Sequence, residues 1–297
     1  MTKDLMSLDE MLKILELASD VGFKHVKITG GEPLLREKRR GDVIPLIKII
    51  SERSYFEDVQ LVTNGSLLSR YAKELSNSGL NSITVSLDAA TPETFKEITG
   101  RDEFCKVLEG IAKVTKYGLP VKINAVIAKD NIDEIPGLID IAGDFHASLK
   151  LIDYMDVGSK KKEWLQNYVP FDGIIQYLER ISVSEDVLLP PGGLGTPMPL
   201  YTLKDGTKVL VKDSRIGTNY NELCKSCENY PCQDALISLR ITANAALKRC
   251  LIRNDNLVET LEDLRCGNFE SVRAKLKESY DLLMGAKYMK NAWRPPC

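Results

Sequence analysis

The stretch KITGGEPLLRE, Lys27–Glu37, decides how the fold is read. A short apolar run is followed by two glycines, an acid and a proline. This order is expected for a strand, a tight turn and the polar start of the next segment. A glycine pair lets a backbone approach a ligand closely, and Glu32 can accept hydrogen bonds from an ammonium group. Because similar tetrapeptides occur in many loops, this turn predicts a ligand site only together with its neighbours in the chain.

Strands and helices alternate through the first half of the chain. A helix is expected over SLDEMLKILELASDVG, where Ser7 and Glu10 have the capping-box spacing and Gly22 ends the helix. The strand KHVKITG follows. The cycle then recurs with strands at DVQLVTNG, NSITVSLD, PVKINAVIAKD and SLKLIDYMDVG, and with helices over about 42–51, 67–78, 92–117 and 132–142. This alternation predicts parallel strands joined by right-handed crossovers, in a doubly wound sheet or a barrel. We expect the strands to be apolar on both faces.

The pattern changes after Val157. A helix at FDGIIQYLERI is followed by LLPPGGLGTPMPL, which is rich in proline and glycine, and we place a domain boundary there, near residue 185. The alternation in YTLKDGTKVLVKD around Asp205-Gly206 predicts a hairpin, and a closing helix is expected over about 268–284. The sequence therefore predicts a first domain over 1–185 and a smaller second domain over 186–297.

Composition excludes several classes of partner. The 297 residues carry a net charge of -2, which gives no electrostatic reason to bind nucleic acid or an anionic membrane. No apolar run approaches the roughly 18 residues of a membrane span, and the first ten residues do not form a signal peptide. We expect a cytoplasmic protein.

Four of the seven cysteines crowd into one segment. Cys224-x2-Cys227-x4-Cys232 is compact, and 17 residues separate Cys232 from Cys250. In a cytosolic protein such a group is more typical of metal binding or catalysis than of disulfides. Zinc and iron–sulfur clusters both use four-sulfur shells, so the spacing does not separate them. The alternative is four unligated buried cysteines.

Polar residues gather where the expected strands end. They are Thr29-Gly30-Gly31-Glu32, Thr63-Asn64-Gly65, Ser86 and Asp88, Asn124, and Met155-Asp156. Ligands bind at this edge in open parallel sheets and in barrels alike. Such residues also simply form loops, but their recurrence on five successive strands favours a binding site.

An ordered set of motifs from about residue 7 to about residue 255 resembles the radical S-adenosylmethionine superfamily, and most closely the GTP 3',8-cyclase family of molybdenum-cofactor biosynthesis. The motifs are KITGGEPLLR, LVTNGSLL, SGLNSITVSLDA, FKEITG, FCKVLEGI, VKINAVI, LIDYMDVG with Trp164, and CKSC followed by LRITANAALKRCLI. The resemblance implies an α/β fold, a partial (β/α) TIM-like barrel with a small C-terminal α+β iron–sulfur domain. It also implies a [4Fe-4S] cluster and S-adenosyl-L-methionine, whose 5'-deoxyadenosyl radical takes a hydrogen from the substrate before cyclisation.

The resemblance also assigns a cofactor pocket. Gly30 and Gly31 would meet the methionine part of S-adenosyl-L-methionine, and Glu32 would support its amino group. Ser86 and Met155 would line the rest of the pocket.

Substrate and cluster residues follow from the same resemblance. Lys27, Lys122 and Arg240 would face the nucleoside triphosphate. Lys27 and Lys122 lie in expected parallel strands, where an unpaired charge costs several kcal/mol, so a role as solvated surface residues is disfavoured for them. An auxiliary cluster would be bound by Cys224, Cys227 and Cys250, with Cys232 as a possible fourth ligand. The implied partners are GTP or another metabolite, and an electron donor such as a flavodoxin or ferredoxin.

The chain departs from the family in its cysteines. The family carries Cys-x3-Cys-x2-Cys just before its first helix, whereas no cysteine precedes Cys105 here. We therefore expect the chain as given to lack one barrel strand and the radical-cluster ligands, and not to cleave S-adenosylmethionine by itself. A truncated enzyme, a missing part supplied by another chain, and a non-catalytic metal-binding relative, including a zinc ribbon, remain open.

Two further departures concern the substrate. The family spaces its auxiliary cysteines as Cys-x2-Cys-x13-Cys, whereas 22 residues separate Cys227 from Cys250 here and Cys232 lies between them. A fully ligated cluster would not bind a purine, which favours the alternative of another metabolite or a peptide as substrate. Ser238 and Val62 replace an arginine and a threonine of the family. GTP 3',8-cyclase chemistry stays the leading hypothesis.

Overall fold

The structure is a computed structural model that describes residues 5–156, 161–189, 196–233 and 238–295. Val157 and part of the proline- and glycine-rich stretch lie outside these residues. The main feature is an eight-stranded sheet in the order β1-β2-β3-β4-β5-β8-β7-β6. Its strands are β1 His25–Ile28, β2 Asp58–Thr63, β3 Ser82–Ser86, β4 Val121–Ile127, β5 Ser148–Asp153, β6 Ser182–Leu188, β7 Met198–Leu203 and β8 Lys208–Lys212.

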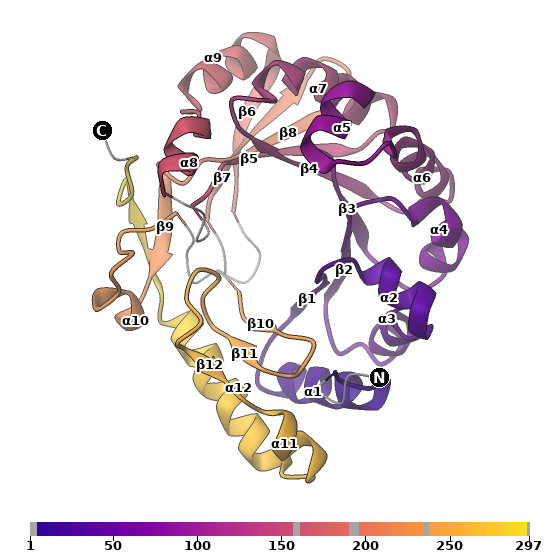
Figure 1. Ribbon diagram of the computed structural model, residues 1–297, viewed down its shortest axis with the longest axis vertical. Helices are drawn as coiled ribbons and strands as arrows, with labels where there is room; N and C mark the ends of the chain where they lie inside the picture. The colour runs from indigo at the N-terminus through magenta and orange to yellow at the C-terminus, as the bar shows by residue number, and fades with distance from the viewer. Residues whose placement is uncertain (1–4, 157–160, 190–195, 234–237, 296–297) are drawn as a thin grey trace.

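The sheet curls into an arc with helices on its convex side (Figure 1). Strands β1 to β5 and β8 are parallel, and β7 and β6 are added antiparallel. The outer helices are α2 Pro33–Arg40, α3 Val43–Glu52, α4 Leu68–Ser76, α5 Pro92–Thr99, α6 Phe104–Lys116, α7 Ile135–Asp144, preceded by the short η1 Ile132–Glu134, and then α8 Lys161–Asn167 and α9 Asp172–Ile181. This architecture confirms the predicted partial barrel.

Two helices differ from the prediction. The single helix expected over 92–117 is two, because Gly100 adopts a φ of 67° and ends α5. Helix α2 occupies the polar segment after the turn, with Glu32 as its N-cap and Pro33 in its first turn.

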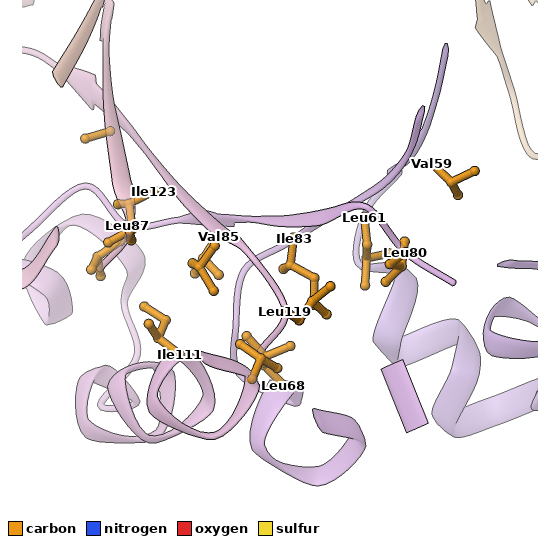
Figure 2. Close-up of a cluster of buried hydrophobic side chains, with 14 of the residues drawn as sticks. Val59, Leu61, Leu68, Leu80, Ile83, Val85, Leu87, Ile111, Leu119 and Ile123 are labelled. Atoms are coloured by element: carbon orange, nitrogen blue, oxygen red, sulfur yellow. The ribbon is translucent and has the colours of Figure 1, made fainter. Parts of the chain in front are cut away.

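The convex face of the sheet holds the core. Leu61, Ile83 and Val85 are fully buried on this face, and Figure 2 shows them on the same side of the sheet as Leu68 of α4 and Ile111 of α6, with Leu80 beside Leu61. Each such side chain contributes about 1.5 to 3 kcal/mol of burial free energy.

The concave face is polar, so the expectation of strands that are apolar on both faces was wrong. Lys27, Gln60 and Ser82 are direct neighbours on β1, β2 and β3, and Thr84 is the neighbour of Lys122. Successive side chains of a strand point to opposite faces of the sheet. Because helices cover only the convex side of this curled sheet, the alternate side chains that point inward are not packed against a helix layer.

The sheet continues past the boundary expected near residue 185. That position lies inside β6, and β8 pairs with β5 as the next parallel strand. The predicted hairpin at Asp205-Gly206 is confirmed as the link between β7 and β8, with Gly206 at a φ of 88°. Strand pairing thus assigns β6, β7 and β8 to the main sheet.

The C-terminal part closes against the first helix. The capping box of α1 Leu8–Asp20 is present, and the expected closing helix is α12 Phe269–Met284. The rings of Phe23 and Tyr280 meet edge to face with centroids 5.1 Å apart. The remaining elements are β9 Gly217–Tyr220, α10 Glu222–Lys225, β10 Arg240–Ile241, β11 Leu247–Lys248, β12 Leu257–Val258, α11 Leu261–Arg265 and β13 Lys287–Lys290. Within the described residues, every helix is too short or too polar to traverse a lipid bilayer.

Candidate functional site

The turn after β1 leaves its backbone open. Gly30 has a φ of 141°, a conformation that favours glycine, and a Cβ on either Gly30 or Gly31 would meet no heavy atom within 4 Å. Gly65, by contrast, is required by packing, since a Cβ there would lie 2.8 Å from Val107 Cγ1. Protein packing therefore does not explain Gly31, and the backbone of the turn is open to close approach from outside.

Glu32 joins two strand tips. Its Oε1 accepts hydrogen bonds from Thr63 Oγ1 at 2.7 Å and from the Leu34 backbone N–H at 3.0 Å. Its Oε2 accepts one from the Asn64 N–H at 2.7 Å. The carboxylate thus caps α2, fixes the turn after β2, and keeps acceptor capacity on Oε2 for one further donor.

The other two predicted pocket residues lie at the same edge of the sheet. Ser86 ends β3, is exposed, and pairs in register with Asn124 of β4. Met155 follows β5, and its Sδ accepts a hydrogen bond from Lys212 Nζ at 3.4 Å. Because the carboxyl ends of parallel strands share one edge, the pocket predicted from the sequence is spread over the tips of β1, β3 and β5.

The predicted phosphate lysines share the concave face. Lys27 keeps contact with solvent, but the surrounding residues partly desolvate its ammonium group and so lower its pKa. The nearby charge of Lys122 lowers this pKa further, and the charge of Asp58 raises it.

Sequence reasoning missed two further lysines there, Lys150 on β5 and Lys212 on β8. Burial, followed by the charges of Lys212, Lys27 and Lys122, lowers the pKa of Lys150 to about 8. Lys150 lies in the interior of an expected parallel strand, and that signal could have found it. Lys212 was expected only in a hairpin, so its place in the parallel sheet was not visible in the sequence.

A buried carboxylate connects the barrel to the cysteine segment. Asp153, at the end of β5, accepts hydrogen bonds from Ser214 N and from Gln233 Nε2, both at 3.1 Å. Burial raises the pKa of Asp153, and the charge of Lys212 opposes the rise. Gln233 directly follows Cys232, so this contact fixes the segment beside the tip of β5.

The cysteines gather in one region without forming a single-ion site. Burial raises the pKa of the Cys224 thiol, and the neighbouring thiols of Cys250 and Cys227 raise it further. Cys232 lies by Tyr220, whose hydroxyl donates to the Cys232 carbonyl at 2.6 Å. Within the residues that the structure describes, no three His, Cys, Asp or Glu side chains are placed to hold one metal ion. A four-iron cluster is larger than one ion and needs its thiolates further apart.

Arg240 belongs to a different sheet from the lysines. It is on β10, in the three-stranded sheet β10-β11-β12, with Lys248 as its register partner. The backbone N–H of Met6 donates to Ala243 O at 2.8 Å, which ties this small sheet to the segment before α1.

Comparison with known proteins identifies the relatives of this chain. A family model described as the radical SAM superfamily matches residues 2–142. A GTP 3',8-cyclase of Syntrophomonas wolfei is 32% identical over 300 residues, covering 97% of this chain and 84% of that protein. A probable GTP 3',8-cyclase of Pyrococcus abyssi is 34% identical over 262 residues, covering 87% and 79%. A solved structure described as native anSMEcpe with bound AdoMet has a TM-score of 0.56 at 15% identity, covering 94% of this chain and 74% of that one, and shows the fold alone.

The fold and the matched family model place the chain in the radical S-adenosylmethionine superfamily. The glycine turn, Glu32 and strands β1 to β4 lie within the matched residues, whereas β5 to β8 follow them. Within the superfamily, the identity over nearly the whole length shows that the chain belongs to the GTP 3',8-cyclase family.

Proposed function

We propose that the chain binds S-adenosyl-L-methionine at the tips of β1, β3 and β5 and a nucleoside triphosphate, GTP first, on the lysine-bearing concave face. The observation that carries this proposal is the position of Lys27, Lys122 and Lys150 below the edge that holds the open glycine turn. The family activity to which this binding would contribute is GTP 3',8-cyclase chemistry, in which a hydrogen is taken from the substrate before ring closure.

The residues of the turn fit the cofactor. The exposed backbone at Gly30 and Gly31 leaves room for the amino-acid end of the sulfonium compound, and Glu32 is an anionic acceptor for its ammonium group. Ser86 and Met155 would contact the nucleoside part. When bound, the cofactor supplies the hydrogen-abstracting chemistry of the superfamily, and the residues of this chain bind and orient it.

The lysines fit a polyphosphate. Ammonium groups are point charges suited to phosphate oxygens, and their mutual repulsion is relieved when an anion enters. Arg240 would contact the substrate from β10.

The cysteines fit one cluster and not the other. Cys224, Cys227 and Cys250 supply thiolates close enough to influence one another and would hold an auxiliary [4Fe-4S] cluster, with Cys232 as a candidate fourth ligand. The 297 residues contain no Cys-x3-Cys-x2-Cys, so they supply no ligand set for the radical-generating cluster. A low-potential protein such as a flavodoxin or ferredoxin is the electron donor that this chemistry would require.

A second function is favoured by the cysteine insertion. If Cys232 completes the auxiliary cluster, no iron is left for the substrate, and another metabolite or a peptide becomes the better candidate.

Calorimetric titration of the anaerobically reconstituted chain with S-adenosyl-L-methionine and with GTP tests both readings. The leading proposal expects both to bind. Binding of S-adenosyl-L-methionine without GTP supports the second function, and binding of neither contradicts both. Iron analysis of Cys232→Ala should show an unchanged cluster if three cysteines hold it, and a clear loss of iron if all four do.

A further inference from the structure

Lys212 faces both proposed pockets. On β8 the alternate residues Val209 and Val211 are fully buried in the core, which turns Lys212 to the concave face. Its register partner on β5 is Ile152, and Lys150 is the next inward residue of that strand. Its ammonium nitrogen lies 3.4 Å from Met155 Sδ.

The contact with Met155 is a weak one for a cation. A thioether sulfur is a poor acceptor compared with an anionic oxygen. The nearby carboxylate of Asp153 is already engaged by Ser214 and Gln233. An anion that enters from the concave face would therefore offer the Lys212 ammonium a stronger partner than the one it has.

Lys212 extends the row of lysines on the concave face, which consists of Lys27, Lys122 and Lys150. Lys122 and Lys212 lie on the two strands that flank β5, where their register partners are Ser148 and Ile152. Two strand spacings of about 4.8 Å and a four-residue offset of about 3.3 Å per residue separate the two backbone positions by about 16 Å. A single phosphate reaches only part of that span, whereas a chain of phosphates follows it. Among the acids near these lysines, Asp58 acts on Lys27 and Asp153 on Lys212, so the row keeps a net positive charge.

We propose that Lys212 is a specificity-determining residue that binds the end of the substrate's phosphate chain and so selects nucleoside triphosphates over diphosphates and monophosphates. This inference rests on the proposed function, because it assumes that the concave face is the substrate site. It assigns to β8 a contact that the motifs in the sequence do not indicate.

The test compares phosphate chains of different length. Lys212→Met removes the charge and keeps an unbranched side chain, and Lys204→Met removes an exposed charge in the β7–β8 hairpin as the matched control. Dissociation constants are measured by calorimetry at low salt for GTP, GDP, GMP and inorganic tripolyphosphate. Lys212→Met should weaken GTP and tripolyphosphate by about tenfold and GMP by less than about twofold. Lys212→Arg should retain the preference, and Lys204→Met should behave as the wild type.

The outcomes separate the two proposals. The inference is overturned if Lys212→Met keeps the wild-type ratio of GTP, GDP and GMP affinities, or if the wild type binds neither GTP nor tripolyphosphate. If tripolyphosphate binds in a Lys212-dependent way and GTP does not bind, the phosphate contact of Lys212 is supported and GTP is excluded as the substrate. An unchanged Tm shows that Lys212→Met is folded.

Discussion

Replacing Glu32 with glutamine tests the central clamp of the site. Glutamine keeps one carbonyl oxygen, so it can still serve either the Oε1 position or the Oε2 position but not both. If it serves Thr63 and Leu34, its amide NH2 faces the Asn64 N–H, and that charge-assisted hydrogen bond, 2.7 Å long in the native chain, is lost. A bond of that kind contributes about 1.5 to 3 kcal/mol.

The remaining two bonds weaken as well, because a neutral acceptor forms hydrogen bonds about half as strong as a carboxylate does. Water can reach Asn64 at the exposed tip and offsets part of the loss. We therefore expect Glu32→Gln to lower the free energy of unfolding by about 2 to 3 kcal/mol in total. At about 2 °C per kcal/mol for a chain of this size, Tm falls by about 4 to 6 °C.

The assay is thermal unfolding followed by circular dichroism, with Glu93→Gln, an exposed residue in the first turn of α5, as control. A double-mutant cycle with Thr63→Val isolates the shared bond and should give a coupling energy of about 1 kcal/mol. Affinity for S-adenosyl-L-methionine should fall by about tenfold because the ammonium loses its anionic partner. A Tm within 1 °C of wild type, or strictly additive effects of the two substitutions, refutes the clamp.

The other predictions address the glycines, the lysines, the first helix and the cysteines. Gly31→Ala should leave Tm nearly unchanged while weakening S-adenosyl-L-methionine binding, whereas Gly65→Ala, with its φ of 78° and its contact with Val107, should lower Tm by several degrees; equal effects on Tm contradict the distinction. The pKa of Lys150 is about 8 in the folded chain and about 10.4 unfolded. The penalty for its charge therefore applies fully below pH 8 and fades as the pH rises toward about 10.4, so wild type should gain stability relative to Lys150→Met across that window. GTP affinity should fall above pH 8 in wild type and stay flatter in the variant, as titration at stepped pH would show. Ser7→Ala should cost about 1 kcal/mol in urea unfolding by removing the α1 capping box. Cys227→Ser should strip iron from the reconstituted chain and Cys105→Ser should not; retention of iron by Cys227→Ser would exclude the proposed ligand set.

Local patterns predicted most of the elements correctly. Ser7, Glu10 and the glycine after α1 marked the first helix because capping depends on residues close in sequence. The split between α5 and α6 was missed, although Gly100 was visible in the sequence, because a glycine within a helical pattern signals a stop only when its φ is known.

The amino-acid sequence by itself determined the strand and turn around Gly30 and Glu32, the grouping of the cysteines and the family to which the chain is similar, because each depends on residue type and short spacing. The tertiary structure alone decided which face of each strand is turned inward, that Glu32 is bound to Thr63 and Asn64, and that Lys150 and Lys212 join Lys27 and Lys122. Those relations depend on strand register and on the curvature of the sheet. Both arise from contacts between segments far apart in the chain, so no local pattern contains them.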